Sequence, residues 1–184
     1  MREKIERATK KEFPSGIPSF GTDALRLTFA SLASGSRDIN FDVKRVEGYR
    51  NFCNKLWNAS RFIKLQCKGY KKSKKLSDDP IDKWIRSEFN KSLEGYVDHI
   101  DNSRFDLATQ VLYEFIWEKL CDWYIEFCKI RLNDQSIAKA EKAQIKNSLL
   151  DIFEKTLKLA HPMMPFITEE IWQSFKETFN TKEK

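Results

Sequence analysis

Apolar residues recur at intervals of three and four along most of this 184-residue chain, and no segment alternates apolar and polar residues over the length of a strand. This spacing places apolar side chains on one face of a helix, so it predicts an all-α fold. The chain is long enough for one sizeable domain with its own core. We therefore expect a helical bundle of about five main helices.

The apolar pattern and the helix-breaking residues give the expected boundaries. Helices are predicted over 22–33, 43–65, 80–100, 105–130 and 136–160, with a short one over 168–179. Asp42 and Asp79 are placed to cap two of them, and Pro80 suits a first helical position. Two prolines and a glycine interrupt the chain near its start, so residues 1–20 are interpreted as a lead-in segment and residues 21–184 as the helical domain.

Large apolar side chains are concentrated in the segment 105–130, which we expect to be the most enclosed helix, with Trp123 in the core.

The four cysteines have no paired CxxC spacing, which favours reduced core thiols over disulfides or a metal site; they are Cys53, Cys67, Cys121 and Cys128. No stretch approaches eighteen uncharged apolar residues, and the N-terminus lacks a secretory apolar run. A cytoplasmic monomer without membrane contact is expected.

Positive charge is concentrated in one part of the chain. The segment 43–75 holds eleven basic residues and one acid, Glu47, a net charge of +10 against +6 for the whole sequence. Such a polarised surface attracts polyanions by long-range steering and counterion release. A solvated basic helix followed by a flexible lysine loop has the same charge pattern, so charge alone leaves both interpretations open.

The segment 43–65 has two chemically different faces. Its core stripe recurs at three and four and consists of Val46, Tyr49, Phe52, Cys53, Leu56, Ser60 and Ile63. The other face is polar and ends in an aromatic ring. It carries Lys44, Asn51, Lys55, Asn58 and Phe62, with Arg61 beside them. Amide and ammonium groups next to an exposed ring are typical of a surface that binds unpaired nucleotides.

Motifs for catalysis are absent from the sequence. The two histidines, His99 and His161, suit capping or surface roles, and no GxxxxGK[ST], GxGxxG or HExxH motif occurs. Acid pairs at predicted helix starts are explained by the helix dipole. The lysines of 71–75 are interpreted as a flexible basic loop that serves as a solvated linker. We therefore expect no catalytic residue, no bound cofactor and no metal in this chain.

Several runs resemble one family. Residues 21–26 read GTDALR, which is similar to the opening of the anticodon-binding domain of class I aminoacyl-tRNA synthetases. Residues 37–42 and 44–62 resemble the valyl enzymes more than their isoleucyl or leucyl relatives. Residues 115–124 and 161–172 are similar to later helices of the same domain, so the resemblance covers essentially the whole chain.

The resemblance implies a function. It implies a tRNA-binding part of a valine–tRNA ligase, in which ATP and valine bind a catalytic core outside this chain, so that the chain alone is inactive. It also implies that the family's anticodon contacts fall on Lys44, Lys55, Arg61 and Phe62, while Asn51 and Asn58 come from the helical face described above. The implied partner is the anticodon stem-loop of valine tRNA, whose shared adenine and cytosine would be read directly.

Two alternatives stay open at the level of sequence. The first is the same domain from an isoleucyl or leucyl enzyme, which competition between valine and isoleucine anticodon loops would separate. The second is a basic helical bundle that binds an acidic protein, and its binding would be indifferent to base identity.

Overall fold

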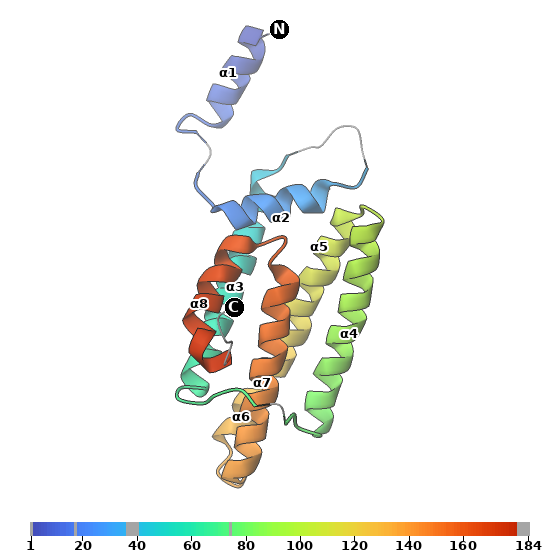
Figure 1. Ribbon diagram of the computed structural model, residues 1–184. Helices are drawn as coiled ribbons and strands as arrows, with labels where there is room; N and C mark the ends of the chain where they lie inside the picture. The colour runs from blue at the N-terminus through green and yellow to red at the C-terminus, as the bar shows by residue number, and fades with distance from the viewer. Residues whose placement is uncertain (1, 17, 36–40, 74, 180–184) are drawn as a thin grey trace.

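The fold is all-α, as predicted, and is assembled from helices of unequal length. A computed structural model describes residues 2–16, 18–35, 41–73 and 75–179. Its helices are α1 (Arg2–Glu12), α2 (Thr22–Leu32), α3 (Val43–Gln66), α4 (Pro80–Asp101), α5 (Phe105–Glu114), the π-helical η1 (Phe115–Tyr124), α6 (Ile125–Asn133), α7 (Lys139–Ala160) and α8 (Pro165–Phe179) (Figure 1). Three parts of the prediction lie outside the described residues: motif residues 37–40, Lys74 of the lysine run, and the last residues of the predicted domain, 180–184.

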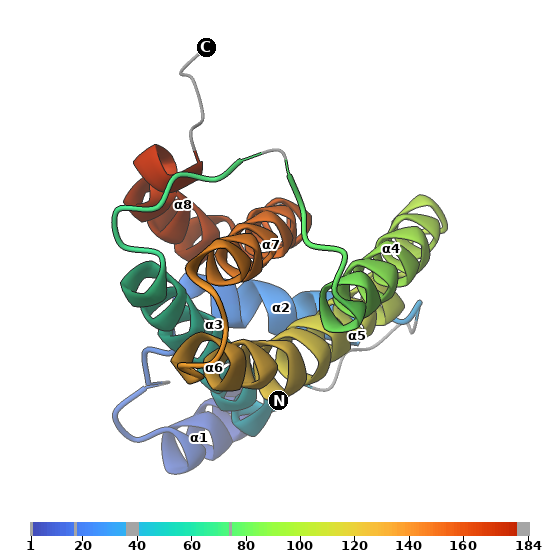
Figure 2. The ribbon, with the colours of Figure 1, turned by 90° about the horizontal axis from the view of Figure 1, so that it is seen from below.

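The long helices run side by side, and α2 crosses one end of the bundle (Figure 1). Figure 2 views the bundle from the opposite end. A common interior is surrounded there by α3, α7, α8 and the continuous rod of α5, η1 and α6. Helix α4 packs along α5. Their apolar stripes meet in one core that includes Phe52, Leu56, Leu112, Tyr124 and Phe153. Helix α1 projects beyond α2 (Figure 1).

Most predicted helix ends are confirmed. Asp42 caps α3 by accepting a hydrogen bond from the Lys44 amide, and Asp79 caps α4 by accepting one from the Ile81 amide. The start predicted at Ser136 is wrong, because the Asp134 carboxylate accepts hydrogen bonds from the amide and hydroxyl of Ser136 and holds a turn there. The lead-in segment 1–20 contains a helix that was not predicted, α1, with a strongly charged sequence.

The single α-helix predicted over 105–130 is wrong in its middle. Residues 115–124 form a π-helix, in which backbone hydrogen bonds run to the fifth residue instead of the fourth. The buried side chains of η1 include Phe115 with Leu120 and Ile116 with Cys121, two pairs spaced by five. That spacing suits a π-helix, and an analysis limited to intervals of three and four misses it.

The π-helix also places one aromatic that was predicted in the core on the surface. Trp123, expected in the core, is 56% exposed and contacts only the ring of Phe127 among the described aromatic pairs. Tyr124 is fully buried instead, and its hydroxyl donates a 2.7 Å hydrogen bond to the buried carboxylate of Asp82. The prediction failed because one extra residue per turn rotates every later side chain around the helix axis.

The GTDALR run holds the crossing helix α2 onto the bundle. The Asp23 carboxylate accepts hydrogen bonds from the amides of Phe166 and Ile167 at the start of α8. The Arg26 guanidinium donates to the carbonyls of Pro162 and Met163 in the α7–α8 connection. Negative charge at a helix N-terminus is favourable, so the first run of the family resemblance and its last run bind each other.

The segment predicted to be a flexible lysine loop is anchored. Lys72 forms ion pairs with Asp151 and Glu154 on α7, at 2.8 and 2.6 Å, and its amide donates to the Thr178 carbonyl. The Asn147 side chain accepts from the Ser73 amide and donates to the Lys75 carbonyl. The prediction was wrong because these partners lie more than seventy residues away in sequence.

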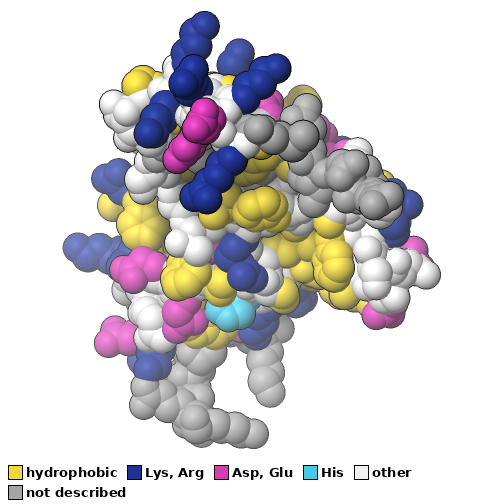
Figure 3. Space-filling model, turned by 90° about the horizontal axis from the view of Figure 1, so that it is seen from above, with side chains coloured by type: hydrophobic (Ala, Val, Ile, Leu, Met, Phe, Trp, Pro, Cys, Tyr) yellow, Lys and Arg dark blue, Asp and Glu magenta, His cyan; other side chains and the backbone are white. Residues whose placement is uncertain are grey.

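The surface contains both charged and apolar regions. Hydrophobic side chains gather on the end of the bundle that α2 covers (Figure 3), where Leu25, Phe29, Phe41 and Phe166 are exposed.

The four cysteines are free, three of them buried, and burial raises the pKa of each thiol to about 12. Among the helices described, none is long and apolar enough to cross a membrane.

Candidate nucleic-acid interface

Helix α3 has the two unlike faces that its sequence predicts. Its core side is buried at Val46, Phe52, Leu56, Ser60 and Ile63. Tyr49 and Cys53 are partly buried and pack against the same core. Other helices, among them α2, η1 and α8, pack against α3, and many of its remaining side chains are exposed.

The six residues predicted to contact the anticodon lie along this helix, and most of them face solvent. Lys44, Asn51, Asn58 and Arg61 are exposed, whereas Lys55 and Phe62 are partly buried. Asn51, Lys55, Asn58 and Phe62 follow each other at three and four residues, and Lys44 lies two turns before Asn51, so the five residues share one side of the helix. We call these five residues the α3 strip. Arg61 lies on the outer side of it.

Lys55 is held by two groups of η1. Its ammonium pairs with the Asp122 carboxylate at 2.5 Å and lies 3.8 Å from the centre of the Trp117 ring. The ammonium carries three donors, and one carboxylate oxygen uses only one of them. Lys55 is therefore fixed in position while retaining donors for a ligand.

Phe62 lies at the far end of the strip, in a position between core and solvent. Its ring packs against the core, and the Lys129 ammonium lies 5.1 Å from its centre. The ring is not sealed inside the bundle, since the residue keeps partial exposure. A base could therefore stack on the part of the ring that remains open.

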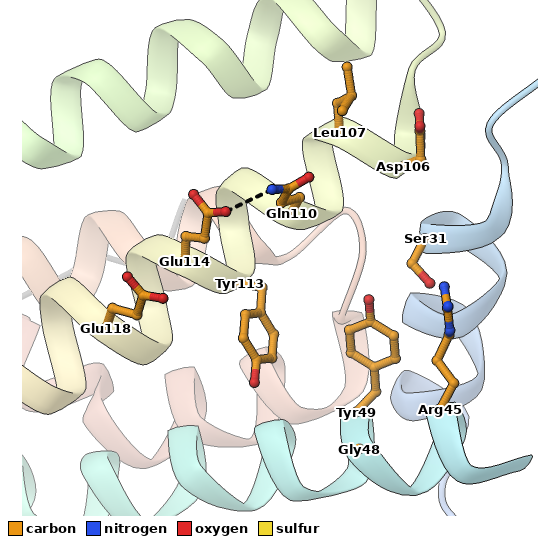
Figure 4. Close-up of a pocket in the computed structure, with 10 residues that line it drawn as sticks. All are labelled: Ser31, Arg45, Gly48, Tyr49, Asp106, Leu107, Gln110, Tyr113, Glu114 and Glu118. Atoms are coloured by element: carbon orange, nitrogen blue, oxygen red, sulfur yellow. Dashed lines mark hydrogen bonds between the residues drawn. The ribbon is translucent and has the colours of Figure 1, made fainter.

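A groove opens beside the start of the strip, between α3 and α5 (Figure 4). Its volume is about 570 Å³, within the range of small-molecule sites. Tyr49 and Tyr113 point into the space between the two helices, and Arg45 lies at the end nearest α2 (Figure 4). Its outer lining includes Gln110, Glu114 and Glu118, which supply hydrogen-bond acceptors.

Stacked rings connect this groove to Lys55. Tyr113 stacks on Phe52 at 4.9 Å and on Trp117 at 5.5 Å between ring centres. Burial, together with the charges of Tyr49, Glu118 and Asp122, raises the pKa of Tyr113, so its hydroxyl stays protonated and can donate. The groove therefore offers aromatic surface, neutral donors and acceptors within one cleft.

A second row of positive charge lies on the outer side of α3. Arg50, Arg61, Lys64 and Lys68 are exposed, and within the described chain none of them pairs with a carboxylate. Arg50, Arg61 and Lys64 lie at intervals compatible with one face of α3, and Lys68 follows in the turn after its end. Unpaired exposed cations at this spacing suit a phosphate backbone, which needs neutralisation along its length.

Several groups of this site could not be identified from the sequence. Trp117, Asp122 and Lys129 contact the strip from η1 and α6, more than sixty residues away. Tyr49 was assigned to the core, but it also lines the groove. The spacing of five between Trp117 and Asp122 is the one available signal, since it places both on one face of a π-helix.

The described residues offer no arrangement typical of a metal centre or an acid–base pair. No group of three or more histidine, cysteine or acidic side chains in this part of the chain could hold a metal ion. His161 is bonded through Nδ1 to the Thr168 hydroxyl at 2.9 Å, and His99 lies at the end of α4 near Asp98.

Comparison with known proteins gives a consistent result. Residues 82–184 match the family described as the anticodon-binding domain of tRNA ligase. The valine–tRNA ligase of Psychrobacter arcticus is 50% identical over 98% of this chain, and that of Francisella tularensis subsp. tularensis is 51% identical over 98%. The valine–tRNA ligase of Coxiella burnetii is 51% identical over 95%. The chain spans about a fifth of the length of these relatives.

Proposed function

We propose, from the premise that this chain belongs to the anticodon-binding domain family of tRNA ligases, that it binds the anticodon stem-loop of valine tRNA. The α3 strip and the adjoining groove would hold the unpaired bases, and Arg50, Arg61, Lys64 and Lys68 would contact the backbone. Residues 21–184 would act as the binding unit. The single observation that carries the proposal is the α3 strip itself, which combines amides, ammonium groups and a ring.

The chemistry of the strip suits single-stranded RNA. Bases in a loop are unstacked, so they can stack on an aromatic ring and expose their edges to amides and ammonium groups. Asn51 and Asn58 each provide both a donor and an acceptor, whereas Lys44 provides donors only. Base identity would therefore be read by the strip, and affinity would come largely from the outer cations.

The proposal extends to the whole protein. The valine–tRNA ligases that match this chain are about five times its length, so we propose that the chain is the anticodon-binding part of such a ligase. ATP and valine would bind elsewhere in that protein, and the ligase would act in the cytoplasm. This chain would contribute tRNA selection and no chemical step.

Binding to matched and altered loops tests the proposal. The chain would be titrated with a valine anticodon stem-loop, an isoleucine stem-loop and a stem-loop with the valine loop scrambled, all at one fixed salt concentration. We expect the valine loop to bind most tightly. Equal binding to the valine and isoleucine loops would favour an isoleucyl- or leucyl-type domain, and equal binding to all three would favour a surface indifferent to base identity.

A further inference from the structure

The side chains of Lys55 and Asp122 form a donor and an acceptor that lie next to each other on the open surface. The Lys55 side chain is 24% exposed and the Asp122 side chain 48% exposed, and they are joined at 2.5 Å. Among the interactions of the described residues, only Oδ1 of Asp122 is engaged, which leaves Oδ2 as a free acceptor. The ammonium likewise retains unused donors.

The π-helix explains why this pair is so well fixed. Trp117 and Asp122 are five residues apart, and in a π-helix such residues lie one above the other. One therefore places its ring beneath the Lys55 ammonium while the other places a carboxylate beside it. A regular α-helix would turn one of the two away from α3. The irregular backbone thus provides a preorganised pair rather than a flexible lysine.

Adjacent donor and acceptor groups distinguish two classes of nucleobase. Adenine and cytosine present an exocyclic amino donor beside an unprotonated ring nitrogen, whereas guanine and uracil present a keto oxygen beside a ring N–H. A base held in one orientation by stacking can satisfy Lys55 at its ring nitrogen and Asp122 at its amino group. A keto base in that orientation would place its oxygen against the carboxylate and its N–H against the ammonium, and both contacts are repulsive.

We propose that Asp122, together with Lys55, is a specificity-determining residue that selects an amino base, adenine or cytosine, in the anticodon loop. The proposal rests on the proposed function, because it assumes that the loop lies on the α3 strip. It also fits the valine loop, in which the second and third anticodon positions are adenine and cytosine. Asp122 would then hold Lys55 in place and accept from the base at the same time.

The test replaces the carboxylate by its neutral isostere. Asp122→Asn keeps the size of the side chain but can turn its NH₂ group toward a keto oxygen, so it removes the repulsion. Binding of the valine stem-loop would be compared with loops in which the middle adenine is changed to guanine or the third cytosine to uracil. We expect the unaltered chain to prefer the amino base by about 5- to 150-fold, the range for one bidentate base contact. Asp122→Asn should bring that ratio close to one at one of the two positions.

Glu88→Gln provides the matched control. It also removes one negative charge, but from the Lys91–Glu88 pair on α4, in which the Glu88 side chain is 21% exposed. This helix lies across the bundle from α3 (Figure 1). A general electrostatic effect would raise affinity for every loop in both variants and leave the ratios unchanged. Because Asp122 is half exposed, the folded state should survive the substitution, and thermal melting would verify this.

The outcomes separate the two proposals. If the unaltered chain binds valine and scrambled loops equally, the proposed function fails and this inference falls with it. If the unaltered chain discriminates and Asp122→Asn keeps the full amino preference at both positions, the proposed function stands and this inference is wrong. A loss of preference at either position, with Glu88→Gln unchanged, supports the role of Asp122.

Discussion

At the scale of single residues, position relative to the core decides what a polar or aromatic side chain can do. Phe62 packs partly on the core and partly faces solvent, and the Lys129 ammonium lies near its ring. Its environment therefore allows both a structural and a binding role. The two roles can be separated by a substitution that keeps the packing but removes the ring.

Phe62→Leu should weaken binding of the valine anticodon stem-loop by about 1 to 3 kcal/mol, the usual contribution of one base stacked on an aromatic ring. Circular dichroism should show unchanged helicity, since leucine still fills the partly buried site. The control is Leu65→Ala on the same helix, where the side chain is 70% exposed and belongs to no core contact. Unchanged affinity in Phe62→Leu would remove this ring from the site.

Trp123 and Tyr124 provide the second test at this scale. Tyr124→Phe should lower the free energy of unfolding by about 1 to 3 kcal/mol, because the buried Asp82 carboxylate loses its shortest hydrogen bond. Trp123→Ala should change that free energy by no more than about 0.5 kcal/mol, since the side chain is exposed. Urea titration measures both. A large loss in Trp123→Ala would mean that this ring does enter the core.

At the scale of elements, the segment between α3 and α4 is fastened to α7. Burial alone would raise the pKa of the Asp151 and Glu154 carboxyls, but hydrogen bonds and charges from Lys155, Lys158 and Lys72 outweigh it and lower both values. A carboxyl whose pKa is lowered on folding stabilises the fold above its unfolded pKa. That stabilisation is lost as the pH falls through the folded pKa.

Lys72→Ala should therefore lower the free energy of unfolding by about 1 to 3 kcal/mol at neutral pH, because two buried carboxylates lose a cationic partner. The difference from the unaltered chain should begin to shrink as the pH falls below the ordinary carboxyl values of 3.8 and 4.5, and it should vanish below the lowered pKa values of the folded state, where both carboxyls are neutral. Chemical denaturation at several pH values measures this.

Lys71→Ala serves as the control for that clamp. Lys71 is exposed and has no carboxylate partner among the described residues, so its loss should leave stability unchanged. It should instead reduce the salt dependence of RNA binding without changing base preference. If Lys71→Ala destabilised the chain as much as Lys72→Ala, the ion pairs would not explain the anchoring.

At the scale of the whole molecule, the chain is a helical bundle with a row of cations along α3 and an apolar end. The α3 strip and the outer cations lie along the bundle, whereas Leu25, Phe29 and Phe166 are exposed at the end where α2 crosses it (Figure 3). The two surfaces are therefore chemically distinct.

The isolated chain should form no valyl-tRNA when it is incubated with ATP, valine and tRNA. Its sequence lacks a phosphate-cradling loop, and its described residues form helices without a nucleotide fold. Transfer of labelled valine to tRNA measures the reaction, and stem-loop binding by the same preparation shows that the protein is active in binding. Aminoacylation above a protein-free blank would contradict the proposed division of roles.

Much of the molecule could be predicted from local patterns. Apolar residues at intervals of three and four predicted most of the helices, and Asp42 and Asp79 predicted the starts of two of them. The pattern of apolar and polar positions predicted the two faces of α3. These features depend on neighbours within one or two turns, so the sequence expresses them directly. The prediction that the fold is all-α is confirmed for the same reason.

The sequence by itself determined the helices and the face of α3 that could bind a partner, because helix formation and amphipathicity are local. Only the tertiary structure decided which of the basic residues in the segment 43–75 are paired. Lys55 meets Asp122 and Lys72 meets Asp151 across long stretches of chain, and packing alone brings them together. The π-helix likewise shows its effect only in the folded bundle, where it buries Tyr124, exposes Trp123 and places Asp122 beside Lys55.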